Sequence, residues 1–547
     1  MKKNVLSLLL IICVYFVGIC LVTLRMMHFD LTTIPGDIGD ARLNNYFLEH
    51  GYKWITGQVS SFWNAPFFYP VTQVMSFSDN HLGTLPIYSF FRFLHFDRET
   101  SYQLWFLAVF TLNYFCCAWV LRKMSINALG AAAGAYVFAF SLPVIAQIEH
   151  SQLLPRFMIP FAFYFAWQYL EKHDTKTLAL ACIAVVIQFY CTIYMGIFLT
   201  LGLISLLVAF NLIQDNRPTL REMVGGDYRT IALRTVIIIL SIINLLPLII
   251  PYYRTSLEYG MRYWAEIATM LPRINSYFYP IQDTFLWNCL RGMGRTLPMP
   301  WEHQIFIGAI PILAFALMPV FYARNRTDPL VKKGMIAFIT TALLILLTLY
   351  VYEDFSLYKF ALFLPGLKAI RAVTRIMLML LFPFAVVLGI FFHSISENRG
   401  LQSHPFVKII FSFLVLFALV LDQNVKAVGF YTYPKLESQN RSANIEKLVK
   451  QKDPETRVFA YMPDKSSDPP FVVHLDAMLA AQSLNMATVN GYSAILPMSY
   501  ADFYDNYDQC SSLLKWKAIS VNKYGQYYKN NEIFKNFHIV GRDTCLD

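Results

Sequence analysis

Apolar positions in this chain gather into long runs separated by short polar stretches. Most runs have about 20 residues, the length at which a helix crosses a hydrocarbon core of about 30 Å. The pattern therefore predicts an α-helical polytopic membrane protein with about eleven transmembrane helices. The expected spans lie at 5–24, 103–121, 128–146, 154–170, 177–191, 196–213, 231–250, 305–323, 334–352, 376–395 and 407–421.

Residues 177–213 decide the topology. This stretch is almost continuously apolar, and we divide it near Gly196. One long, tilted helix is the alternative, and it would reverse the side of every later loop. The first run follows Lys2 and Lys3 and has no small-x-small cleavage site. We interpret it as an uncleaved anchor with a cytoplasmic N-terminus.

Basic residues support this count, because Lys and Arg concentrate in cytoplasmic loops. Each loop placed inside contains some of them: Arg122, Lys123, Lys172, Lys176, Arg217, Arg221, Arg229, Arg234, Arg324, Arg326, Lys332, Lys333, Arg399 and Lys408. Two long loops, 25–102 and 251–304, and the C-terminal part then lie outside. We expect a multi-pass protein of a bacterial inner (cytoplasmic) membrane, with its C-terminal part in the periplasm.

The C-terminal part, 422–547, follows the transmembrane domain, 1–421. It mixes strand-like stretches at 457–461 and 471–474 with a helical stretch at 476–484 and an Asn490-Gly491 turn signal. We therefore expect a small extracytoplasmic α/β domain. Cys510 and Cys545 are its only cysteines, and an oxidising compartment favours a disulfide bond between them.

Composition agrees with a membrane location. The chain is 56% hydrophobic and 15% charged, against about 25% charged in soluble domains. The net charge is +10, but the part after Leu421 has as many acidic as basic residues, so the surplus lies in the membrane half. This distribution indicates contact with anionic membrane lipids rather than nucleic acid.

The most informative polar segment opens the first exterior loop. Asp37 and Asp40 stand beside glycines in Pro35–Arg42, just before an amphipathic helical pattern with Leu43, Tyr46 and Phe47 on one side. Asp40 either begins that helix as an N-cap or serves as a general base. Asp37 has no such structural role in the sequence. Cofactors remain unknown, with a divalent metal ion (Mg²⁺ or Mn²⁺) held by Asp37, Asp40 or Glu149 as one alternative.

Further polar residues are expected at the same exterior edge. Asp79 and His81 follow an aromatic stretch in the first loop, and Glu149 and His150 occupy a very short turn between the third and fourth spans. Sugar rings bind aromatic faces, but aromatic residues also favour the membrane interface. We retain all four polar residues as candidates for substrate binding, beside the alternative of loops touching lipid headgroups.

A cationic group lies before the tenth span. Lys368, Arg371 and Arg375 recur at the spacing of one helix face. Exterior loops under-use basic residues, so this cluster is unusual, and a lipid phosphate fits it. Salt bridges to exterior acids, or side chains reaching for the interface, are the alternative. The sequence has no P-loop, so we do not expect a nucleotide-driven pump.

This layout resembles the GT-C superfamily of integral-membrane glycosyltransferases, in which an acidic motif opens a large exterior loop after the first span. The nearest parallel is the Asp-Glu-x-Arg-Tyr element of aminoarabinose and protein-mannosyl transferases. Here Asp40-Ala41-Arg42 stands in its place, with Asp37 ahead. Ala41 replaces the usual second acid, so either Asp37 and Asp40 form the pair or only one is catalytic. Segments 36–86, 147–155 and 365–375 also resemble uncharacterised bacterial members.

The resemblance implies an inverting glycosyltransferase that uses a polyprenyl-phosphate-linked sugar. Asp40 or Asp37 would be the base, Arg42 would contact substrate, and the cations would stabilise the leaving phosphate. The acceptor would be a glycan, lipid or protein of the cell envelope. A non-enzymatic flippase or transporter of lipid-linked glycans is the main rival, but it needs charged residues within spans. A protein of envelope assembly is the third hypothesis, and it leaves the acids unexplained.

Overall fold

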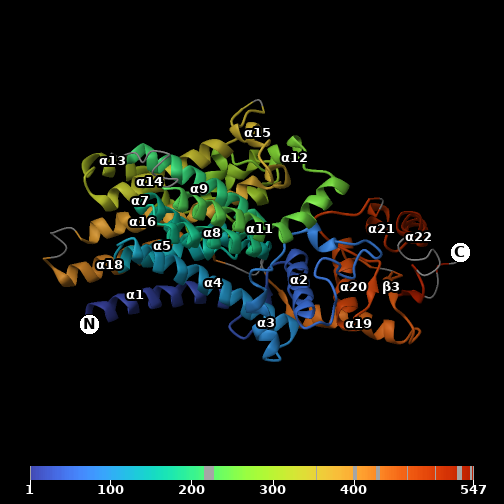
Figure 1. The fold of residues 1–547 in the computed structure, drawn as a ribbon. Coiled ribbons are helices and arrows are strands. Elements are labelled where there is room, and N and C mark those ends of the chain that lie inside the picture. The colour runs from blue at the N-terminus through green and yellow to red at the C-terminus, as the bar shows by residue number, and fades with distance from the viewer. Residues whose placement is uncertain are drawn as a thin grey trace.

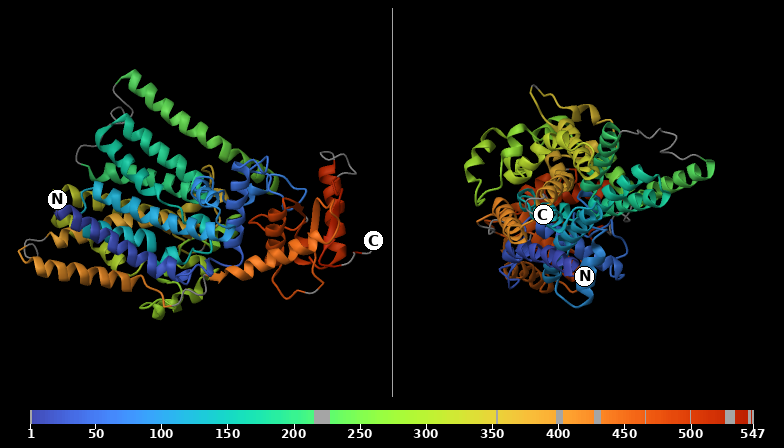
Figure 2. Two further views of the ribbon diagram at one scale, coloured as in Figure 1. Left: turned by 90° about the horizontal axis from the view of Figure 1, so that it is seen from below. Right: turned by 90° about the vertical axis from the view of Figure 1, so that its left-hand side faces the viewer.

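The computed structural model describes residues 2–214, 227–352, 354–397, 403–426, 432–464, 466–498, 500–525, 533–542 and 545. Apolar helices gather at one end of the molecule and a mixed α/β part lies at the other, with α2 and α3 between them (Figure 1). The N-terminus lies at the far end of the helical part from the α/β part (Figure 2). Arg217, Arg221 and Arg399, basic residues of the predicted inner loops, lie outside the described residues.

Every predicted span coincides with helical structure. The helices are α1 (Lys2–Gly18) with its π-helical extension η1 (Ile19–Leu24), α4 (Arg98–Lys123), α5 (Ala128–Phe140) with α6 (Leu142–Ile145), α7 (Met158–Lys172), α8 (Thr175–Cys191), α9 (Ile193–Ile213), α11 (Tyr228–Tyr259), α13 (Ala309–Arg324), α14 (Pro329–Thr348), α16 (Ile376–Ser396) and α18 (Pro405–Asp422). Within the described ranges, seven helical segments are long and apolar enough to cross a membrane, and α8 and α13 are shorter apolar helices. The total of eleven crossings stays a prediction.

The continuous apolar stretch 177–213 folds as two helices, so the alternative of one long helix is wrong. The break falls at Thr192, whose extended backbone ends α8 and starts α9. One side chain from the segment between η1 and α4 holds this break. The Asp79 carboxylate accepts hydrogen bonds from Thr192 Oγ1 at 2.6 Å and from Ile193 N at 2.9 Å.

The centre of the helical part is formed by α5 and α16. The span that contains α5 is 100% buried within the protein and the span that contains α16 is 89% buried. Glycines permit the contact: a Cβ atom on Gly130 would lie 2.1 Å from Gly389 O, and one on Gly134 would lie 2.6 Å from Ala385 O. Small residues let membrane helices approach closely. In contrast, only 11% of α11 is buried, and this tilted helix lies at the edge of the group (Figure 2).

The first exterior loop forms a layer between the two parts. It contains β1 (Thr33–Pro35), α2 (Asp40–Ile55), η2 (Val74–Phe77) and α3 (Leu85–Phe93). The short helix η3 (Ser151–Leu153) belongs to a later connection, which follows α6. β1 pairs antiparallel with β2 (Thr432–Pro434), with Ile34 opposite Tyr433. The loop is thereby fixed to the beginning of the C-terminal part.

The α/β part contains a three-stranded parallel sheet. Its strands are β3 (Val458–Tyr461), β4 (Ala487–Thr488) and β5 (Phe537–Val540), in the order β4-β3-β5, and its helices are α19 (Lys435–Lys450), α20 (Pro470–Leu484), α21 (Ala501–Asp505) and α22 (Cys510–Tyr524). Strand β3 was expected. The predicted strand 471–474 is wrong, because these residues belong to α20, which a proline at its start favours.

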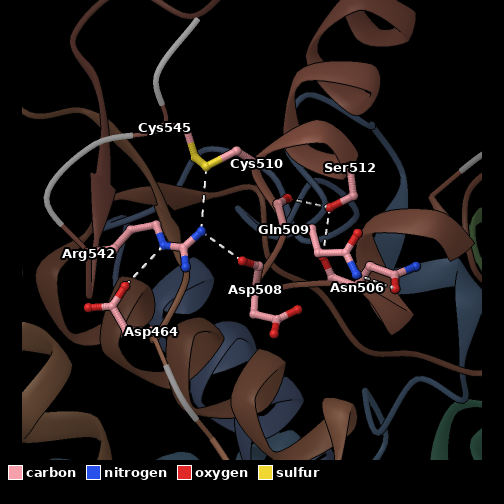
Figure 3. The surroundings of a disulfide bond; sticks show 8 residues. All are labelled: Asp464, Asn506, Asp508, Gln509, Cys510, Ser512, Arg542 and Cys545. Atoms are coloured by element: carbon pink, nitrogen blue, oxygen red, sulfur yellow. Dashed lines mark hydrogen bonds and ion pairs between the residues drawn. A yellow bond between two sulfur atoms is a disulfide. The ribbon is translucent and has the colours of Figure 1, made fainter.

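The expected disulfide bond is confirmed. Cys510 at the start of α22 is bonded to Cys545, with their Cα atoms 5.3 Å apart. Arg542 lies beside the bond and also contacts Asp464 and the carbonyl group of Asp508 (Figure 3). These contacts attach the end of the chain to the α/β part.

Shorter elements connect the remaining spans. The second exterior loop contains α12 (Trp264–Thr269), η4 (Ile274–Phe278), η5 (Asn288–Thr296) and η6 (Pro300–His303). Between α14 and α16 lie α15 (Leu357–Ala361), η7 (Leu367–Ala369) and η8 (Val373–Arg375). The predicted helix face through Lys368, Arg371 and Arg375 is wrong, because extended backbone at Ile370 and non-helical backbone at Ala372 separate the two short turns.

Candidate active site

A cavity of about 390 Å³ lies where the apolar helices meet the α/β part and the segments that connect the helices. It is lined by the start of α2, the loop after η2, the turn at 150–152, the first residues of α9, the end of α11, residues 369–375 and the segment Tyr492–Ile495 of the α/β part. Five of the predicted candidates line it: Asp40, Asp79, His150, Arg371 and Arg375.

Asp40 presents its carboxylate to this cavity. One oxygen, Oδ1, accepts a hydrogen bond of 2.7 Å from the Tyr492 hydroxyl group. The other, Oδ2, lies 3.5 Å from Nε2 of His150. The N-cap alternative for Asp40 is wrong, because Gly39 is the N-cap and Asp40 is the first residue of α2.

Asp37 caps the start of α2, which is the role that the sequence suggested for Asp40. Its Oδ1 atom accepts a hydrogen bond of 3.0 Å from the Ala41 backbone N–H in the first turn of α2. It does not line the cavity. Burial and the nearby charge of Asp40 raise the pKa of Asp37 to about 6.

A second acid shares this environment. Burial, together with the charges of Asp37 and Asp40, raises the pKa of Glu149 to about 7. Burial lowers the pKa of His150, and the charge of Arg375 lowers it further. His150 is therefore neutral near pH 7, and a neutral imidazole makes no full ion pair with Asp40.

The proposed metal ligands do not fit a metal ion in this arrangement. Asp37 accepts from a backbone N–H, and Asp40 accepts from Tyr492. Among the described residues, no three His, Cys, Asp or Glu side chains form a group with metal-binding geometry. The chemistry that we propose below therefore contains no step at Mg²⁺ or Mn²⁺.

Two buried residues, Gln152 and His81, hold the side chain of Asn44 in the cavity lining. The Asn44 amide donates to Gln152 Oε1 at 2.8 Å and to the Asp40 carbonyl oxygen at 2.7 Å. Its Oδ1 atom lies 2.7 Å from Nε2 of His81. Burial lowers the pKa of His81 to about 3, so the ring is neutral and supports Asn44 from behind the cavity wall.

The cations of the 365–375 segment separate into three environments. Arg375 is buried and makes a bidentate ion pair with Glu302, with Nε–Oε2 at 3.0 Å and Nη2–Oε1 at 2.7 Å. Burial alone would raise the pKa of Glu302, but Arg375 lowers it to about 2. Arg371 is more accessible and lies 3.7 Å from Glu266. Lys368 is exposed and does not line the cavity.

Sequence reasoning missed a third cavity cation, Arg262. It follows α11, contacts Glu266 at 3.3 Å and donates to the Ala494 carbonyl oxygen at 3.3 Å. Arg262 and Arg371 thus share one carboxylate, while Arg375 has its own. No local motif marks Arg262, because it reaches the cavity only when the second exterior loop folds back onto the segment before α16.

Two other candidates have structural contacts. Asp79 lines the cavity, but its carboxylate is held by the start of α9 as described above, and burial raises its pKa. Arg42 is fully buried away from the cavity and binds Ser438 Oγ at 3.1 Å and the Asp476 carboxylate. Arg42 therefore joins α2 to the α/β part instead of facing substrate.

Comparisons with known proteins identify the fold. A scan of protein-family models and a search of curated proteins found no match. Among solved structures, the crystal structure of the oligosaccharyltransferase of Archaeoglobus fulgidus in the apo form matches with a TM-score of 0.52 and 12% identity, over 97% of this chain and 71% of that one. The same organism's oligosaccharyltransferase AglB, in complex with an inhibitory peptide and a dolichol-phosphate, matches with a TM-score of 0.51 and 12% identity, over 96% and 71%. The chain therefore has the fold of these two oligosaccharyltransferase structures, and the fold implied by the sequence resemblance is confirmed.

Proposed function

We propose that this chain, a membrane protein with the GT-C fold, is an inverting glycosyltransferase. It transfers a sugar from a polyprenyl-phosphate-linked donor to a cell-envelope acceptor on the extracytoplasmic side of a bacterial inner membrane. One observation carries the proposal: a carboxylate, Asp40, and two arginines, Arg371 and Arg375, line the same cavity between the apolar helices and the α/β part.

In the proposed step, Asp40 accepts the proton of an acceptor hydroxyl group. The oxygen of that group attacks the anomeric carbon of the sugar and forms the new glycosidic bond. The bond from that carbon to the phosphate oxygen breaks, and the lipid phosphate leaves with the electron pair. Base and leaving group act on opposite faces of the sugar, so the anomeric configuration inverts.

The arginines are not equivalent in this step. Arg375 is already neutralised by a short bidentate pair with Glu302, so it contributes a fixed scaffold. Arg262 and Arg371 share Glu266 at the longer distances of 3.3 and 3.7 Å. This pair carries one unbalanced positive charge at the cavity, which suits a phosphate leaving group. We assign phosphate binding first to Arg371 and Arg262.

Two observations support a lipid-linked donor. Long apolar helices adjoin the cavity, which supports a site beside a membrane, where a polyprenyl chain is soluble. In addition, the AglB structure of the same fold was obtained with a dolichol-phosphate bound. The rival transporter function has less support: Arg156, a buried cation beside the helix core, donates to the carbonyl oxygens of Phe138 and Leu378 at 3.0 Å each and is not free to line a path.

The test is transfer activity per unit of membrane-inserted protein. Lipid-linked intermediates and envelope glycans from a deletion strain and its parent first identify the substrates. We expect Asp40→Asn to lower kcat by about 10²-fold or more, the scale of general-base loss, with unchanged protein level. Arg371→Ala should raise KM for the donor as well as lower kcat.

Matched variants separate chemistry from folding. Asp37→Asn keeps a cap for α2 and should retain most activity, since Asp37 does not reach the cavity. Arg42→Ala removes a cation two residues after Asp40 that lies outside the cavity. It should lower the amount of folded protein and leave the activity per unit of protein unchanged. Wild-type specific activity in both Asp40→Asn and Arg371→Ala would overturn the proposed site.

A further inference from the structure

Tyr492 connects the reactive carboxylate to a distant part of the chain. It lies 452 positions after Asp40, yet its hydroxyl group donates a hydrogen bond of 2.7 Å to Asp40 Oδ1. The ring also lines the cavity. Among the described residues, this hydrogen bond is how a side chain of the α/β part reaches the Asp40 carboxylate.

The local fold fixes the position of Tyr492 closely. Beyond β4, the Asn490 side chain bridges the end of β3, accepting from Tyr461 N at 2.7 Å and donating to Tyr461 O at 3.1 Å. Gly491 then packs so tightly that an added Cβ would lie 2.1 Å from the Phe68 ring. The Tyr492 backbone N–H contacts Met478 Sδ at 3.2 Å. The hydroxyl group is therefore presented to Asp40 from a rigid turn.

The hydrogen bond distinguishes the two carboxylate oxygens. Oδ1 accepts the hydrogen bond from Tyr492, whereas Oδ2 lies 3.5 Å from Nε2 of His150. We infer that Tyr492 is a positioning residue: its hydroxyl group holds Oδ1 so that Oδ2 faces the acceptor hydroxyl group. The α/β part thereby completes the reactive site. This inference rests on the proposed role of Asp40 as the base.

The decisive variant is Tyr492→Phe, measured as transfer activity against donor concentration. We expect kcat to fall about tenfold or more with little change in the donor KM, because the hydrogen bond that orients the base is lost while the donor contacts remain. Tyr500→Phe is the matched control: it removes a buried hydroxyl group that donates to Val489 O at 2.9 Å, close to the same turn but outside the cavity lining. It should leave kcat near the wild-type value.

A second measurement tests the bond without activity. In a thermal-unfolding cycle of the purified protein, Tyr492→Phe and Asp40→Ala should lower Tm by less together than the sum of the two single effects. Additive shifts would overturn the inference. So would a wild-type kcat in Tyr492→Phe when Asp40→Asn is inactive. Full activity in Asp40→Asn would instead refute the proposed base.

Discussion

The buried carboxyl group of a single residue, Asp37, makes the free energy of unfolding depend on pH. Its pKa is about 6 in the folded protein against a usual value of 3.8. The folded state therefore binds the proton more tightly than the unfolded state, and stability falls as pH rises from about 4 to about 6, then levels off.

Asp37→Asn should remove part of this dependence, because asparagine resembles the protonated acid and still caps α2. We expect the Tm of the wild type in detergent to decrease more between about pH 4.5 and pH 7.5 than the Tm of the variant. Glu149, with its pKa raised to about 7, contributes in the same direction and remains in both proteins. Equal decreases in the two proteins would contradict the burial of the charge at Asp37.

Residue-level prediction from the sequence succeeded where chain neighbours determine the environment. Asp40 was placed at the beginning of α2, and its carboxylate faces the cavity. The partners were not predictable: Tyr492, Glu302 and Arg262 approach from other parts of the chain. Arg42 shows the same limit, because only the folded C-terminal part reveals that it pairs with Asp476.

At the scale of elements, the contact between α5 and α16 depends on glycine. Gly130→Ala would place a methyl carbon 2.1 Å from Gly389 O, far inside van der Waals contact, so the two helices must separate. We expect Tm to fall by several degrees, or the amount of folded protein to drop, because backbone atoms cannot yield as a flexible side chain does.

Gly292→Ala provides the control for this prediction. An added Cβ at Gly292 meets nothing within 4 Å, so its Tm should stay near that of the wild type. Thermal unfolding of both variants in the same detergent is the measurement. An unchanged Tm in Gly130→Ala would show that the helices approach less closely than the structure indicates.

Helices were more predictable than the segments between them. Apolar length located each span, and the break in 177–213 lies within a few residues of the expected place. The segment 367–375 was misjudged because a spacing of three and four residues indicates a helix only when the backbone is continuous. At 471–474, β-branched residues suggested a strand, but the preceding prolines and packing of α20 determine a helix.

At the scale of the whole molecule, the opposite placement of the two ends is consistent with an odd number of crossings. The N-terminus and the α/β part lie at opposite ends of the helices (Figure 1). We expect a reporter fused after Ala323 to be cytoplasmic and a reporter at the C-terminus to be exterior. Paired phosphatase and fluorescent fusions at both positions measure this directly, and the same side for both would refute the count of eleven.

The pairing of β1 with β2 has a consequence for the order in which the protein is made. Thr33–Pro35 leads into the loop that carries Asp40, but its partner, Thr432–Pro434, is synthesised only after all the apolar helices. A nascent chain therefore inserts its spans while the reactive loop still has an open strand edge. Tyr492, which contacts Asp40, also follows the last apolar helix, so the proposed site is complete only when the C-terminal part has been made and has folded. We therefore expect a chain truncated before Thr432 to insert its helices but to lack transfer activity.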